Sequence, residues 1–128
     1  MCEENSFVPN DSLIEEFMDL PELLARVEND RELLTELLVM FRNELPELQN
    51  ALHDAIDLGD LAQAAKVAHT LKGMSANMSL RRGTSLITEI EAAAKSGDIP
   101  VLTKRLVALD TEITGLSAAI DALTVGTQ

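Results

Sequence analysis

The sequence predicts an all-α protein: an antiparallel up-down-up-down four-helix bundle with an additional short N-terminal helix. The apolar residues are mainly Leu, Ala, Ile and Met, with only 2% aromatic side chains, a set that favours helices over strands. Five segments carry apolar residues at alternating spacings of three and four, and no segment of useful length alternates as a strand does. Short turns join the segments, and short turns make neighbouring helices antiparallel.

The N-terminal part has the least regular pattern. Apolar residues recur from Leu13 to Val27, but Pro21 interrupts them. We expect a short helix or turn to about residue 18, and then a second short helix with Pro21 in its first turn, where the missing N–H is harmless. The single cysteine, Cys2, cannot form an internal disulfide and is consistent with a reducing compartment.

The next segment carries a seam of seven apolar positions: Leu34, Leu38, Phe41, Leu45, Leu48, Leu52 and Ala55. Asp30 is a candidate N-cap for this helix. Pro46 removes one helical hydrogen bond inside it, which predicts a kink rather than a break. Gly59 suits the left-handed C-cap position, and Asp60 can cap the helix that follows.

Three further helices follow. The first has an inward seam of Leu61, Ala64, Ala68, Leu71, Ser75 and Met78. The second covers roughly residues 80–95, with Leu86, Ile87, Ile90 and Ala94 inward, and ends at a second Gly–Asp pair, Gly97 and Asp98. The last has a seam of Ile99, Leu102, Leu106, Leu109, Ile113, Leu116, Ile120 and Leu123. We therefore expect a partly helical N-terminal extension over 1–18, a bundle domain over 19–125 and a frayed C-terminus over 126–128.

The charge of the chain restricts its partners. With 22 acids against 10 bases the net charge is −12, which disfavours binding to nucleic acid or to anionic membrane surfaces. The longest unbroken apolar run, Leu37 to Phe41, is too short to cross a bilayer. The first ten residues lack the basic and apolar regions of a secretory signal. The expected location is the cytoplasm.

One face of the predicted helix that begins at Leu61 combines unusual residue types. His69 lies one position beyond the inward seam, so it points outward, and its helical neighbours are Ala65, Lys66, Lys72 and Gly73. A glycine inside a helix costs about 1 kcal/mol relative to alanine. We expect glycine at this position because a residue without a Cβ leaves space for another protein to approach His69 closely. Two more small residues occupy the same side one helical repeat away: Ala62 and Ala76.

The part of the sequence around His69 also lacks acidic residues. No Asp or Glu occurs from Leu61 to Ile87, where an even distribution would place about 5. Four of the ten bases lie there: Lys66, Lys72, Arg81 and Arg82. A histidine in such surroundings suits a phosphoryl group, because a neutral imidazole is a nucleophile and the Lys72 ammonium can pair with phosphate oxygens.

The segment AHTLKGMSANMSL, residues 68–80, resembles the signature of histidine-containing phosphotransfer (HPt) domains, close to A-H-x-L-K-G-x-[SA]-x-x-[LIVM]-G-[AL]. The matching residues are Ala68, His69, Leu71, Lys72, Gly73, Ser75, Met78 and Leu80. The resemblance extends over roughly residues 19–123, including the helix with Pro46 before the motif and LITEIEAAAKSGD after it. The chain departs from the pattern at Ser79, where the family usually has glycine. We expect Ser79 to cap the following helix.

The resemblance implies a phosphotransfer role. His69 would accept a phosphoryl group from an aspartyl phosphate on a response-regulator receiver domain and pass it to another receiver, with a hybrid sensor histidine kinase as a further possible partner. Lys72 would steady the phosphate and Gly73 would give access, with Lys66, Ala62, Ala65 and Ala76 around them. The receiver would supply Mg²⁺ and most catalytic groups, so the chain needs no cofactor. It would be a monomeric phosphoryl carrier and not an enzyme with turnover of its own.

Other interpretations stay open at this point. The chain could be a helical interaction or scaffold module whose histidine is never phosphorylated. An ATP-dependent kinase is disfavoured, because no nucleotide-binding glycine motif is present. His53 is interpreted as a surface histidine near Asp54 and Asp57, and a metal site is not expected.

The remaining basic and methionine side chains are less specific. Lys66 could equally be a solvated lysine, and Arg81 and Arg82 are expected to pair with acids. Met40, Met74 and Met78 are core residues or, where exposed, part of a docking surface.

Overall fold

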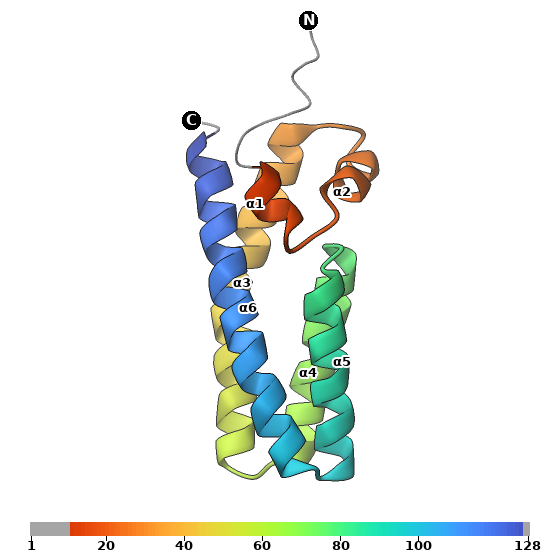
Figure 1. Ribbon diagram of the computed structural model, residues 1–128, viewed down its shortest axis with the longest axis vertical. Coiled ribbons are helices and arrows are strands. Elements are labelled where there is room, and N and C mark those ends of the chain that lie inside the picture. The colour runs from red at the N-terminus through yellow and green to blue at the C-terminus, as the bar shows by residue number, and fades with distance from the viewer. Residues whose placement is uncertain (1–10, 127–128) are drawn as a thin grey trace, which may run out of the picture.

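The computed structural model describes residues 11–126, with the side chains of residues 13–123, so Cys2 and residues 127–128 lie outside it. It contains the helices α1 (Asp11–Glu15), α2 (Leu20–Arg26), α3 (Arg31–Asp57), α4 (Leu61–Asn77), α5 (Arg81–Ser96) and α6 (Ile99–Gly126). The four long helices form an antiparallel bundle, and α1 and α2 lie at the end where α3 begins and α6 ends (Figure 1). The predicted all-α fold is confirmed. No helix within residues 11–126 is both long enough and apolar enough for a membrane span.

Aspartate side chains begin most of the long helices. The Asp30 carboxylate accepts from the Leu33 amide at 3.0 Å, and the Asp60 carboxylate accepts from Gln63 at 3.0 Å. Asp98 accepts from the Val101 amide at 3.3 Å at the start of α6. Each such cap stabilises its helix by about 1 kcal/mol. The turns before two of them contain Gly59 and Gly97 at φ 74° and 77°, so both glycines occupy the predicted left-handed position.

Most residues of the predicted seams are buried in the core, but four are only partly buried: Leu48, Leu61, Met78 and Leu86. In α4, Ala64, Ala68 and Leu71 are fully buried, and Ser75 is 2% exposed. The seam of α6 is buried from Leu102 to Leu123, but the prediction for Ile99 is wrong. Ile99 is 48% exposed because it is the first residue of α6, at the end of the bundle, where a side chain is covered on fewer sides than in the middle.

Two expectations concerned the long helices themselves. α3 is one uninterrupted helix that contains Pro46, so the helix is not broken there. α6 reaches Gly126, one residue into the segment expected to fray. The N-terminal part also follows the prediction: α1 ends at Glu15, and α2 has Pro21 in its first turn and Asp19 as its N-cap.

The turn between α4 and α5 differs from the prediction. Leu80, not Ser79, is the N-cap of α5, and no side chain caps this helix. Ser79 has a φ of 56°, the left-handed conformation that a glycine adopts without strain. Its hydroxyl therefore points away from the α5 amides and donates to the Glu22 carboxylate of α2. The expected cap is wrong because the backbone at 79 needs a positive φ, whereas an N-cap residue has extended backbone.

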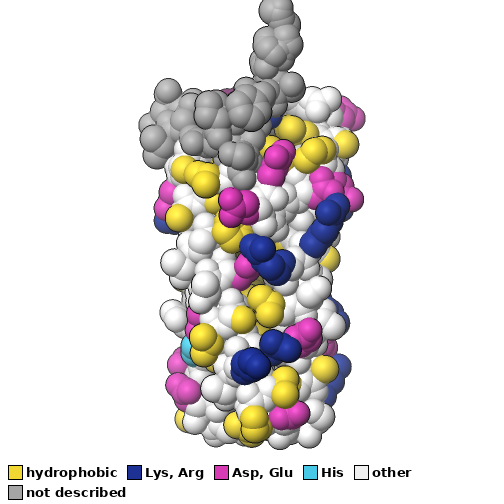
Figure 2. All heavy atoms as spheres, viewed as in Figure 1, with side chains coloured by type: hydrophobic (Ala, Val, Ile, Leu, Met, Phe, Trp, Pro, Cys, Tyr) yellow, Lys and Arg dark blue, Asp and Glu magenta, His cyan; other side chains and the backbone are white. Residues whose placement is uncertain are grey.

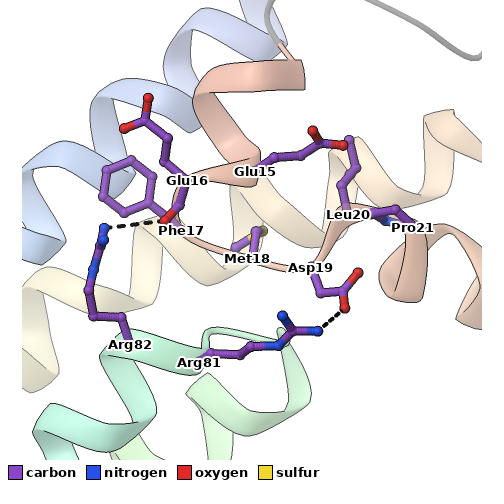
Figure 3. A pocket seen from close by; sticks show the side chains of 9 residues that line it. All are labelled: Glu15, Glu16, Phe17, Met18, Asp19, Leu20, Pro21, Arg81 and Arg82. Atoms are coloured by element: carbon purple, nitrogen blue, oxygen red, sulfur yellow. Dashed lines mark hydrogen bonds and ion pairs between the residues drawn. The ribbon is translucent and has the colours of Figure 1, made fainter.

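The same turn anchors the N-terminal helices to the bundle. The Asp19 amide donates to the Ser79 carbonyl at 3.0 Å, and the Arg81 guanidinium pairs with the Asp19 carboxylate (Figure 3). Arg82 donates to the Glu16 carbonyl at 3.2 Å and lies over the Phe17 ring, 5.5 Å from its centroid. Both arginines thus pair with acids or backbone acceptors, as expected.

The surface of α5 and α6 carries mixed charge. Basic and acidic side chains are interspersed on this face, which Figure 2 shows. Arg82 pairs with Glu112 at 2.9 Å, and Arg105 pairs with Glu89 at 2.5 Å. Such alternation is typical of a solvated helix surface and contrasts with the lysine-rich side of α4 described next.

Candidate functional site

The His69 side chain lies on the outer surface of α4 and is 71% exposed. It follows Ala68, which is fully buried, so the seam that packs α4 into the bundle also holds the histidine at the edge facing α5. Its Nδ1 atom is 3.3 Å from the Oε2 atom of Glu91 on α5. The outward orientation predicted from the helical pattern is therefore confirmed, but the histidine has a carboxylate partner that the pattern did not indicate.

Glu91 connects the basic residues of the site. Its side chain is only 7% exposed, and its two oxygens bind two lysines from two helices. Lys72 of α4 lies 2.7 Å from Oε1, and Lys95 of α5 lies 3.1 Å from Oε2. A nearly buried carboxylate requires such partners, because desolvation of an unpaired charge is costly.

These ammonium groups hold Glu91 in its charged form. The hydrogen bond from Lys72, and next the bond from Lys95, lower the pKa of Glu91 from 4.5 to about 2, against the opposing effect of burial. The carboxylate is therefore ionised throughout the physiological range. An ionised carboxylate can only accept hydrogen bonds.

The ionised carboxylate selects one tautomer of the His69 ring. A hydrogen bond between Nδ1 and Glu91 requires the proton on Nδ1, which leaves the lone pair on Nε2. Nε2 is the ring nitrogen turned away from Glu91, on a side chain that is mostly exposed. The nucleophilic Nε2 atom therefore faces solvent, and the hydrogen bond from Nδ1 to Glu91 holds the ring in this orientation.

A shallow depression of about 480 Å³ lies beside the histidine. It is lined by the following residues: Ala62, Ala65, Lys66, His69, Glu91 and Lys95. Ala62 is exposed, whereas Ala65 is 8% exposed and mainly contributes to packing against the core. Lys66 is exposed at the rim. Together with Lys72 and Lys95, which bind Glu91, three lysines from two helices lie near His69.

Gly73 provides open space on the outer side of α4. A Cβ atom added there would have no heavy atom within 4 Å apart from its own helix. Packing inside the chain therefore does not require glycine at this position. Ala76 is also exposed, one turn further along α4.

Sequence reasoning missed Glu91 and Lys95. Both lie on the next helix, and the acid-free stretch ends at Ile87, before either residue. Counting outward from the α4–α5 turn could have found them, because antiparallel helices pair residues at similar distances from the turn. His69 is eight residues before the end of α4, and Glu91 is ten residues after the start of α5.

His53 lies on a different side of the bundle. Its Nε2 atom is 2.8 Å from the Asp110 carboxylate of α6, which also accepts from Gln49 at 2.8 Å. The carboxylate that it binds is therefore on α6, and is not one of the acids near it in the sequence, Asp54 and Asp57. His53 is 38% exposed and joins α3 to α6. Within the described part of the chain, no group of three or more His, Cys, Asp or Glu side chains could hold a metal ion.

One protein family matches the part of the chain that contains this site. The family model described as the Hpt domain matches residues 36–119, which include α4 and α5 with His69 and Glu91. No curated protein matches the chain.

Two solved structures are similar in fold. One is histidine-containing phosphotransfer protein B from Pseudomonas aeruginosa PAO1, with a TM-score of 0.76 and 23% identity, over 83% of this chain and 92% of that one. The other is the HPT domain of an Hpt sensor hybrid histidine kinase from Shewanella, with a TM-score of 0.70 and 24% identity, over the same shares. The fold is that of Hpt domains, and the family model matches well over half of the residues. The chain therefore belongs to the Hpt domain family, whose members are phosphoryl carriers, rather than kinases, in two-component signalling.

Proposed function

We propose that His69 accepts a phosphoryl group from the aspartyl phosphate of a response-regulator receiver domain and transfers it to the aspartate of another receiver. The observation that carries this proposal is the combination of an exposed imidazole with a nearly buried, ionised carboxylate at its Nδ1 atom. A surface histidine without a specific role does not require a carboxylate partner that two lysines bind in turn, as Lys72 and Lys95 bind Glu91.

The chemical step balances with the groups present. The Nε2 lone pair attacks phosphorus, the P–O bond to the donor aspartate breaks, and the aspartate leaves as a carboxylate. The ring then carries a positive charge with its proton still on Nδ1, and Glu91 stabilises that charge. In the second transfer the acceptor aspartate attacks phosphorus, the P–N bond breaks, and the neutral ring returns. Mg²⁺ on the receiver would assist both steps.

The three lysines suit the charge of the transferred group. A phosphoryl group on His69 adds about two negative charges beside Lys66, Lys72 and Lys95. Glu91 neutralises only one of these cations, so the cluster keeps excess positive charge for the phosphate. Lys72 thus has two roles in this proposal: it holds Glu91 in the resting state and it pairs with phosphate oxygens after transfer.

The small residues suit the approach of the receiver. Gly73 has no side chain, and the exposed Ala62 and Ala76 have small ones, so little bulk covers the outer side of α4. A receiver can therefore bring its aspartate to Nε2. A close approach is needed because in-line transfer requires reacting atoms about 3–3.5 Å apart.

The test uses purified receivers phosphorylated with radiolabelled acetyl phosphate. We expect wild-type protein to acquire label that is stable in base and labile in acid, as a phosphohistidine is. His69→Gln should acquire none, and His53→Gln is the matched control that should behave like wild type. Label that persists in His69→Gln would overturn the assignment. Absence of transfer from every receiver of the source organism would favour the scaffold interpretation.

Two variants test the surrounding residues. Lys72→Ala should lower the transfer rate by about tenfold, equivalent to ~1.4 kcal/mol, because a charge-assisted contact to the phosphate is lost. Gly73→Leu should fold like wild type, since its side chain meets nothing within the chain, and should transfer slowly because its bulk blocks docking. A wild-type rate in either variant would remove that residue from the proposal.

A further inference from the structure

The outer side of α6 carries few charged residues for a helix in such an acidic chain. Between positions 99 and 123 its exposed residues are Ile99, Pro100, Val101, Thr103, Lys104, Val107, Thr111, Thr114, Ala118 and Asp121. Only Lys104 and Asp121 among them are charged, whereas half of the exposed residues of α3 are acidic. Val107 is 61% exposed in the middle of this side. Depletion of charge around exposed apolar residues is typical of the centre of a protein interface.

The outer side of α6 also repeats with the period of a helix that packs against another helix. Its residues follow one another at alternating spacings of four and three: Pro100, Lys104, Val107, Thr111, Thr114, Ala118 and Asp121. We call these seven residues the outer seam. Such spacing keeps side chains on one side of a helix and is the spacing by which pairs of helices pack. α6 thus has one seam buried in the bundle and a second one exposed.

The charged residues that flank the outer seam are mostly neutralised within the chain. The ion pairs are Arg82–Glu112 and Arg105–Glu89 on the side toward α5, and Arg42–Asp121 on the side toward α3. Two copies of a chain with a net charge of −12 repel each other. This repulsion is weakest where the charges of the surface are balanced, so the outer side of α6 is the face by which two copies can meet.

The outer seam is complementary to itself in one orientation. An antiparallel pair of α6 helices, related by a two-fold axis midway between Glu112 and Ile113, brings different residues of the seam together across the axis. The pairs are Val107 with Ala118, Thr111 with Thr114, and Lys104 with Asp121. The two charges of the seam therefore meet with opposite signs. A parallel pair would instead place each charge against its own copy, and both contacts would be repulsive.

The outer seam can be covered without burying an unpaired hydroxyl at Thr111. Its hydroxyl donates to the Val107 carbonyl at 3.2 Å, so this donor is already satisfied within the helix. The seam is about 32 Å long, and a strip about 20 Å wide, the width of two packed helices, covers about 600 Å² per copy. Stable interfaces cover about 800 Å² per partner. The area therefore suits a reversible dimer rather than an obligate one.

We propose that the outer seam of α6 binds a second copy of this chain, in an antiparallel dimer with two-fold symmetry. The resemblance to HPt domains implies a monomer, so the proposal replaces that expectation. It does not depend on phosphotransfer. α4 packs against α3 and α5 and not against α6 within the described part of the chain, so the exposed imidazole of His69 stays accessible in both copies.

Sedimentation equilibrium of the full chain tests the dimer, at protein concentrations from about 5 to about 500 µM and about 0.15 M salt. Wild type should change from monomer to dimer within this range. Val107→Glu keeps a good helix former at an exposed position and places a carboxylate in the centre of the contact, so it should raise the Kd for dimerisation by at least about tenfold. Leu58→Glu is the matched control, because Leu58 is 83% exposed in the turn after α3, away from the outer seam.

A charge reversal tests the contact between Lys104 and Asp121. Lys104→Glu should raise the Kd for dimerisation more than Lys66→Glu, although both variants change the net charge equally, because Lys66 lies on α4. Equal effects of the two variants would mean that net charge alone controls association, and this would overturn the proposed pairing.

Disulfide formation tests the antiparallel orientation, in a Cys2→Ser background that removes the natural cysteine. A mixture of Val107→Cys and Ala118→Cys proteins should form a cross-linked dimer under mild oxidation. Either protein alone should cross-link much more slowly, since two copies of the same position lie about 16 Å apart along the helices. Equal cross-linking of a single variant and the mixture would overturn the orientation.

Three results decide the proposal as a whole. A wild-type dimer that Val107→Glu weakens and Leu58→Glu does not would support it. Wild type that stays monomeric at every concentration would overturn it, and so would a dimer that Val107→Glu leaves unchanged. Failure of the dimer would leave the phosphotransfer function intact, and a wild-type chain that accepts no phosphate would leave the dimer intact.

Discussion

Replacement of Glu91 by glutamine tests the central electrostatic feature of the site. The substitution keeps the size of the side chain and removes its charge, so Lys72 and Lys95 lose their shared partner. The pKa of Glu91 is lowered from 4.5 to about 2 by these lysines, which corresponds to an upper limit of about 3 kcal/mol of folding free energy at pH 7. Lys95 is 67% exposed and therefore screened by solvent, so we expect roughly 1.5–2 kcal/mol.

The pH dependence gives this prediction its sign. Because the folded pKa lies below the unfolded one, the stabilisation is fully present above pH 4.5 and is lost as the pH falls toward 2. Urea unfolding should show a gap between wild type and Glu91→Gln that is full at pH 7 and has fallen below about half by pH 3. Glu89→Gln, which removes a half-exposed acid on α5, should change the unfolding free energy by less than about 0.5 kcal/mol.

Two results would refute this reasoning. One is a gap of equal size at pH 7 and pH 3, which would mean that Glu91 stabilises the fold by packing and not by charge. The other comes from ¹⁵N NMR of the His69 ring. In wild type we expect the proton on Nδ1, and in Glu91→Gln a mixture of tautomers. An unchanged tautomer in the variant would show that Glu91 does not select it.

The remaining predictions concern three backbone positions. Ser79→Ala should destabilise the fold by about 1 kcal/mol more than Ser79→Gly in urea unfolding, because both lose the bond to Glu22 but only glycine relieves the positive φ; equal losses would contradict this. Gly115→Ala should cost about 1–3 kcal/mol, since the new Cβ would lie 2.8 Å from the Phe17 ring, and Phe17→Leu should recover part of that loss. Gly73→Ala should raise the unfolding free energy by about 0.5–1 kcal/mol, because alanine favours the helix and its Cβ meets no neighbouring atom. An unchanged unfolding free energy would contradict this open space at position 73.

Most of the fold could be predicted from local pattern. The seams of α3 and α4 were predicted correctly because a helix that packs against others must repeat its apolar residues every three or four positions. The caps at Asp30 and Asp60 follow from side chains that reach only their own helix. Ile99 continues the pattern of α6 and is nevertheless exposed, because a side chain at the end of the bundle is covered on fewer sides than one in the middle.

Ser79 shows a limit of motif comparison. The departure from glycine was visible in the sequence, and serine is a common N-cap, so a cap was a reasonable prediction. The backbone at this position has a positive φ, and the hydroxyl binds Glu22 of α2, more than fifty residues earlier. A partner at that separation depends on where the N-terminal helices pack, which no local pattern contains.

The candidate site could also be predicted only in part from the sequence. The sequence by itself determined that His69, Lys72 and Gly73 share the outer side of one helix, because residues three and four apart must lie together once the helix forms. Only the tertiary structure decided that the Glu91 carboxylate lies beside the imidazole and that Lys72 and Lys95 bind it. That arrangement depends on the register between α4 and α5, which is set by the turn at Ser79 and by the packing of the two seams. A helix specifies its own faces, but the residues that meet across two helices depend on how those helices pack.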